Sequence, residues 1–293
     1  MSAIWFLLAL AHPSLMSADW GLSHQPRPLV APETVRLALH TTLFRRLPLR
    51  PPLSPLPAPL ALREEAVYRV SYGLLGSIGQ LHLSIADERD EGGRRLIKVA
   101  GRGEGSILGL GRSEKSVDAE FDPVTLGARR WTMIRTGGED VTDVIDQAQA
   151  GVLRMARQKP GTPPSTKQVV FSAATPTMDP VGLLMRLRAA PPVAGQSAVL
   201  QVLDGQALWR VNLTGVGRQA LPETEGRVFA VRVDGRADPI YYDGHDADDR
   251  PRRTFAVWLS DDDARVPLRL TMPIGIADVV IQLVEASRTP RAP

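Results

Sequence analysis

The feature that most constrains this chain is a regular alternation of apolar and polar residues, which begins near Glu64 and recurs almost to the end of the sequence. In VYRVSYG, Tyr68, Val70 and Tyr72 share one face of an extended chain. Such alternation is typical of antiparallel strands that bury one face and leave the other in water. The pattern returns in QLHLSIA, ALWRVNLTG, RVFAVRVDG, TFAVWLS, VPLRLTM and GIADVVIQLVEA.

Short turn signals separate these stretches, because glycine readily takes the positive φ that tight hairpin turns require. Many strands joined by short turns predict an all-β domain, built as an antiparallel barrel or a strongly curved half-barrel sheet. Alternation looks the same in both, so the choice between closed and open stays undecided. The predicted turns are Asp90–Gly93, Gly137–Gly138, Ala150–Gly151, Asp204–Gly205 and Asp234–Gly235, and the glycines of GRGEGSILGLG (101–111) are expected to allow bends or bulges.

One helix is predicted within the β pattern, in TMDPVGLLMRLRAAPP. Asp179 is a good N-cap, Pro180 suits the first helical position, and Pro191 and Pro192 end the segment. We expect this helix to pack against the sheet, either plugging one end of a barrel or lying in the concave face.

The N-terminal region has a different composition from the rest of the chain. The apolar run Ala3–Ala11 has the length of a signal-peptide core and is too short to span a bilayer, and Ala11 or Ala18 could precede a cleavage site. We therefore expect residues 1–18 to be a signal peptide and the protein to be exported. Because no Lys or Arg precedes the run, a misplaced start codon or an ordinary apolar N-terminus is the alternative.

Residues 19–62 are predicted to be a proline-rich linker, since proline favours extended chain and removes backbone donors. Within it, PETVRLALHTTLFRRL could form a short basic amphipathic helix that touches an anionic membrane or packs on its own domain. The β domain is expected over residues 63–288 and a disordered tail over 289–293. No transmembrane helix is expected.

Composition argues against several classes of function. The net charge of +3 is small, the arginines are scattered and only 5% of residues are aromatic, so no nucleic-acid partner is expected. The absence of cysteine excludes disulfides, thiolate metal sites and cysteine nucleophiles. No cofactor and no catalytic set is predicted, because the few histidines are dispersed and no glycine run carries the Gly-Lys-Ser/Thr ending of a phosphate-binding loop.

Two acidic clusters are candidate sites. Asp261–Asp263 stands between two alternating stretches, and consecutive residues point in diverging directions, so this cluster is predicted to be a turn. YYDGHDADDRP is predicted to be a solvated hairpin loop; only weak metal-ligand candidates occur there, namely Asp243, His245, Asp246 and Asp248, with Asp249 beside them.

Four stretches resemble the bacterial family catalogued as domain of unknown function 3108. They are EEAVYRVSYGLLGSIGQLHLSI, RRWTMIRTGGEDVTDVIDQAQAGVLRM, MDPVGLLMRLRAAP and VWLSDDDARVPLRLTMPIGIADVVIQL, which together span most of Glu64 to Glu285. The resemblance implies a β-rich exported protein of the periplasm or the periphery of the outer membrane. It implies no activity and no catalytic residues.

The leading hypothesis is a non-enzymatic cell-envelope protein that binds a hydrophobic or amphipathic ligand, such as a lipid, or an envelope protein partner, in the concave face of its sheet. A second hypothesis is a metal-dependent hydrolase that uses the Asp243–Asp249 loop. A third is a scaffold that acts through its proline-rich arm. The sequence does not identify a ligand, a reaction or an oligomeric state.

Overall fold

The computed structural model describes residues 62–107, 111–124, 126–136, 140–149, 152–170, 177–204, 207–222, 224, 228–241, 244–247 and 250–290. The predicted signal peptide (1–18) lies outside the described residues, as does the linker (19–62) apart from Leu62. Those two expectations, and the hypothesis of a partner-binding arm, therefore stay predictions.

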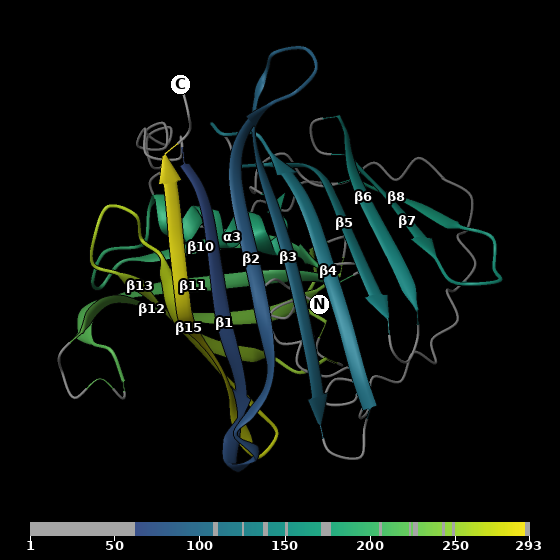
Figure 1. The fold of residues 1–293 in the computed structure, drawn as a ribbon. Helices are drawn as coiled ribbons and strands as arrows, with labels where there is room; N and C mark the ends of the chain where they lie inside the picture. The colour runs from purple at the N-terminus through teal and green to yellow at the C-terminus, as the bar shows by residue number, and fades with distance from the viewer. Residues whose placement is uncertain are drawn as a thin grey trace, which may run out of the picture.

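A single sheet of fifteen strands forms the body of the protein (Figure 1). Its order is β8-β7-β6-β5-β4-β3-β2-β1-β15-β14-β13-β12-β11-β10-β9. The strands are β1 (Leu62–Tyr72), β2 (Ser77–Arg89), β3 (Arg95–Ile107), β4 (Gly111–Phe121), β5 (Ala128–Thr136), β6 (Val141–Gln149), β7 (Val152–Gln158), β8 (Ser165–Val170), β9 (Thr177–Met178), β10 (Ser197–Asp204), β11 (Ala207–Ala220), β12 (Phe229–Ile240), β13 (Arg253–Ser260), β14 (Pro267–Ile274) and β15 (Ala277–Pro290).

The sheet consists of two antiparallel meanders that meet in its middle. One runs from β1 to β8 and the other from β10 to β15, and β15 pairs with β1. The short β9 joins β10 in parallel at the far edge. Within the described ranges no pairing links β8 to β9, so the all-β prediction is confirmed as an open, strongly curved sheet and not a closed barrel. Figure 1 shows β10–β13 crossing behind the steep strands β1–β4.

The alternation in sequence places one continuous apolar face inward. On β1, Ala66, Tyr68 and Val70 are buried, while Arg69 between them is exposed. Inward residues of both meanders belong to the same core cluster, which also includes the helix, so the curved sheet encloses a shared interior. We call the surface that these side chains line the inner face.

The predicted helix is confirmed as α3 (Pro180–Ala189), with the Asp179 side chain accepting hydrogen bonds from the amides of Val181 and Gly182 at 2.8 and 3.1 Å. It is buried on nearly all sides and belongs to the core. Figure 1 places it inside the fold, toward the end of the sheet where β1 begins and β15 ends. The helix therefore covers one end of the inner face.

A buried ion pair fixes the helix in this place. The Arg188 guanidinium donates to both carboxylate oxygens of Glu64 on β1, at 2.9 and 2.8 Å, and to the carbonyl oxygen of Ala264 at 3.0 Å. Arg288 on β15 donates to the same carboxylate at 3.2 Å. Helix, central strands and the β13–β14 turn are thus joined at one point.

The turn prediction for Asp261–Asp263 is confirmed, since these residues connect β13 to β14. The Asp262 carboxylate accepts hydrogen bonds from the amides of Ala264 and Arg265, and Asp261 pairs with Arg218 at 2.6 Å. The aspartates stabilise a loop in which Arg265 has a positive φ of 48°.

Two expectations about glycine were wrong. Asp234–Gly235 is not a turn but lies inside β12, opposite Phe255, whose ring occupies the space where a side chain on residue 235 would stand. Gly101, Gly103 and Gly105 mark no bend or bulge, because they pair in continuous register with β2 and β4. At Gly235 the glycine makes room for the Phe255 ring instead of bending the chain.

We predict that Arg188→Met destabilises the protein by about 3–5 kcal/mol, because it leaves the Glu64 carboxylate buried beside a single, partly exposed arginine. Chemical denaturation monitored by circular dichroism measures the change. Arg63→Ala is the control: its ion pair with Glu65 is exposed on both sides and its loss should cost less than about 1 kcal/mol. Equal losses in the two variants would contradict a structural role for the buried pair.

Candidate binding site

The acidic loop that supplied the weak metal candidates is only partly described. His245 and Asp246 are exposed, and Asp246 accepts a hydrogen bond from Arg210 at 2.6 Å. Asp243, Asp248 and Asp249 lie outside the described residues. Across the part of the chain that is described, no group of three or more His, Asp or Glu side chains is placed to hold a metal ion.

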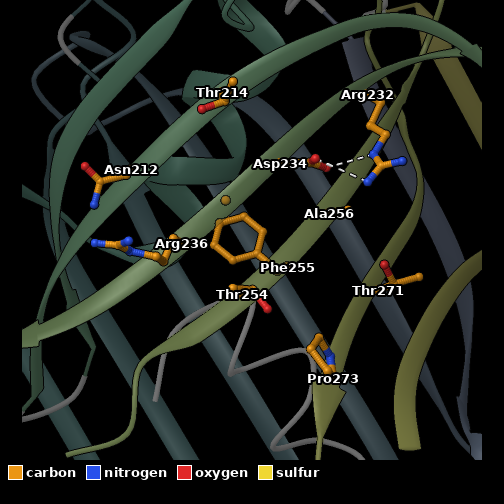
Figure 2. A pocket seen from close by; sticks show the side chains of 11 residues that line it. Asn212, Thr214, Arg232, Asp234, Arg236, Thr254, Phe255, Ala256, Thr271 and Pro273 are labelled. Atoms are coloured by element: carbon orange, nitrogen blue, oxygen red, sulfur yellow. Dashed lines mark hydrogen bonds and ion pairs between the residues drawn. The ribbon is translucent and has the colours of Figure 1, made fainter.

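A polar hollow of about 630 Å³ lies over β11–β14 (Figure 2). Asn212, Arg232 and Asp234, which line it, alternate with the inward residues of their strands, so they belong to the face opposite the core. Arg232 donates to Asp234 at 2.7 and 3.2 Å, as Figure 2 shows, and its guanidinium stands 5.1 Å from the centre of the Trp258 ring. Asn212 donates to Asp238 at 3.1 Å, so the charged and polar groups are already paired, and Phe255, Ala256 and Pro273 complete the lining. The leading hypothesis places the ligand on the concave face, and these polar groups lie on the opposite one.

The inner face has a different character at the end away from α3. There β3 presents Gly101, Gly103 and Gly105 at three successive inward positions, all buried. β3 therefore contributes no side chain to this part of the interior. We call these three residues the glycine strip.

Beside the glycine strip lies Lys115 on β4, directly opposite Gly103. Its alternation with Val117, Ala119 and Phe121 directs it inward, and it is 2% exposed. Its ammonium nitrogen has no hydrogen-bond partner among the described residues. A buried amine without a partner is unusual, because burial of an unpaired polar group costs free energy.

The other side of Lys115 is occupied by a charged network. Arg135 on β5 stands directly opposite Lys115, and Asp143 on β6 accepts from Arg135 at 3.4 Å. Arg157 on β7 donates to both oxygens of the same carboxylate, at 2.6 and 2.9 Å. Asp143 is thus held by two guanidinium groups and does not contact the ammonium.

Burial, and secondarily the charge of Arg135, lowers the pKa of Lys115 to about 7. The four side chains bring three basic groups and one carboxylate together on the inner face. With Lys115 protonated, the group carries excess positive charge in a place of low polarity. The arrangement is suited to attract an anion.

Sequence reasoning missed Lys115, although a signal was present. In GRSEKSVDAEF the lysine is in phase with Val117, Ala119 and Phe121, so an amphipathic strand carries a charged residue on its buried side. A charge at an inward position of a regular alternation marks a partner or a site.

Taken together, the fold and site define an open, antiparallel all-β protein with one internal helix and a basic group on its inner face. The chain belongs to the family of proteins of unknown function DUF3108, whose model matches residues 67–284. This confirms the family resemblance of the sequence.

Solved structures provide two weaker similarities. A β-barrel-like protein of domain of unknown function DUF1849 from Brucella abortus shares 11% identity over 79% of this chain and 99% of its own, with a TM-score of 0.49. LprF from Mycobacterium bovis shares 14% identity over 80% and 90%, with a TM-score of 0.27. At these values neither bears on function, and no curated protein matches. No helix among the described residues is long and apolar enough to cross a membrane.

We predict that Lys115→Met raises the free energy of unfolding, in anion-free buffer at pH 6, by an amount on the order of 2 kcal/mol. The folded-state pKa lies below the unfolded one, so the wild type gains stability as pH rises from about 7 toward 10.5, where the folded protein has released a proton that the unfolded chain still holds. The advantage of the variant should therefore shrink across this window. Denaturation curves between pH 6 and 10 measure it, and a pH-independent difference would contradict the assignment.

Proposed function

We propose that this protein is a non-enzymatic, exported cell-envelope protein that binds an amphipathic ligand on the inner face of its sheet. The observation that carries the proposal is the juxtaposition of the glycine strip and the unpartnered Lys115 ammonium on the inner face. β3 contributes no side chain along the strip, so an apolar body could bind there by displacing the groups that now cover the buried glycines, and the ammonium provides a polar end. A ligand with one apolar and one polar part matches both.

Two hairpin tips support a place of action at a lipid surface. Leu74, at the β1–β2 tip, and Ile276, at the β14–β15 tip, are fully exposed, and Leu75 is half exposed. The tips are neighbours: the Tyr72 hydroxyl donates to the Ile274 carbonyl oxygen at 3.1 Å. Exposed apolar side chains held together in this way are suited to enter the interface of a membrane.

The first experiment is native mass spectrometry of the protein purified from the envelope fraction of its host, with extraction of bound small molecules. We expect a co-purifying amphiphile near one-to-one stoichiometry. Gly103→Val should abolish its retention, because the new side chain fills the glycine strip. Arg102→Val, at the exposed neighbouring position, is the control. An apo mass for the wild type under conditions that retain the fold would argue against the proposal.

A separate experiment tests the two hairpin tips that carry Leu74 and Ile276. We predict that the double variant Leu74→Ser, Ile276→Ser loses most of its co-sedimentation with lipid vesicles, because the exposed apolar area at the tips is removed. Val124→Ser with Val193→Ser removes exposed apolar side chains elsewhere and should leave co-sedimentation unchanged. If both double variants bind vesicles like the wild type, the tips are not the membrane contact.

A further inference from the structure

We propose, building on the inner-face site above, that Lys115, Arg135 and Arg157 receive an anionic head group of the amphipathic ligand, a carboxylate or a phosphate. The ligand class is thereby narrowed from amphiphiles in general to acidic amphiphiles that carry one anionic group beside an apolar chain.

The register of the strands brings two positively charged side chains together. Lys115 and Arg135 face each other directly across the β4–β5 pair, on the same side of the sheet. Opposite positions in an antiparallel pair bring side chains to about 5 Å at their Cβ atoms, and like charges there repel. An anion between the two removes the repulsion and turns it into attraction.

The group holds more positive charges than oxygen acceptors for them. Asp143 is the carboxylate of this group, and its oxygens already accept from Arg157 and Arg135. The Lys115 ammonium donates no hydrogen bond to this carboxylate, and the backbone of the glycine strip adds no charge. An anionic head group would provide the oxygen acceptors that a buried ammonium requires, through short charge-assisted hydrogen bonds.

Apolar side chains extend from Lys115 along the strands. From Lys115 toward α3, the inward positions of β4 are Val117, Ala119 and Phe121, and those of β5 are Met133 and Trp131. Six residues of strand separate Lys115 from Phe121, a length of about 20 Å. An acyl chain anchored at Lys115 would run along this row and the glycine strip toward α3, and it would displace packed side chains there, since none in the row is more than 2% exposed.

The test compares three probes with the same twelve-carbon chain: dodecanoate, dodecyl phosphate and the neutral 1-dodecanoylglycerol. Affinities are measured by the change in tryptophan fluorescence, since Trp131 lies in the same row. We expect both anionic probes to bind the full-length wild type at pH 6 more tightly than the neutral probe. The tighter of the two anions identifies carboxylate or phosphate as the head group.

Lys115→Met is expected to weaken the anionic probes by about 10- to 100-fold, the loss of one charge-assisted hydrogen bond, and to leave the neutral probe unchanged. Lys115→Gln, which keeps a donor without the charge, should fall between. Lys98→Met removes an exposed lysine of β3 and is the matched control. Binding of the anions should also weaken as pH rises through 7 to 8.5, because Lys115 is the group facing Arg135, Asp143 and Arg157 that loses charge there.

The outcomes separate the two proposals. If all three probes bind the wild type and Lys115→Met alike, the head-group assignment is overturned and the inner-face site stands. If none of the probes binds, both are overturned. If inorganic phosphate alone shows a Lys115-dependent effect and the amphiphiles do not, the site takes a free anion and the acidic amphiphile is excluded.

Discussion

The paired contact between Arg188 and Glu64 is the point on which the rest of the structure depends. It joins the buried helix α3 to β1, to the end of β15 through Arg288, and to the β13–β14 turn through the Ala264 carbonyl. The β1–β15 ladder already joins the two meanders, and this contact links the helix to both sides of that ladder. The pair is shielded from water, and its geometry is that of a bidentate guanidinium–carboxylate interaction, which adds direction as well as attraction.

Because the helix is fixed at one end of the inner face, the two ends of that face differ. Near α3 the interior is filled by side chains from both meanders and from the helix. At the other end lie the glycine strip, Lys115 and the network around Asp143. Core side chains such as Val70 and Leu81 also lie at this level, so the two ends differ in charge and not in how far they are filled. An amphipathic ligand has a similar difference in charge along its length. The polar hollow over β11–β14, whose charged groups already pair with one another, offers no such match.

Much of this fold is predictable from local pattern. The alternation at Tyr68 and Val70, the Asp179–Pro180 helix start and the Asp261–Asp263 turn are each determined by residues close together in sequence, and all three are found. What fails depends on pairing between distant strands. Asp234–Gly235 has the composition of a turn, yet Phe255 on the next strand requires the glycine within β12. Lys115 meets Arg135 and, beyond it, Asp143 only through the register of β4 with β5 and of β5 with β6, which no local pattern reveals.

The pairing of β1 with β15 has a consequence for how the chain reaches this state. The central ladder of the sheet joins Leu62 to Pro290, the most distant residues of the described chain, so its hydrogen bonds form only after nearly the whole polypeptide is available. The first meander can assemble earlier, but β1 then remains an unpaired edge at what will become the middle of the sheet. Folding should be slow because of this long-range closure, and a chain that lacks its last strand should offer β1 to other molecules. Because β15 is synthesised last, the β1–β15 pairing at the centre of the sheet is the last to form.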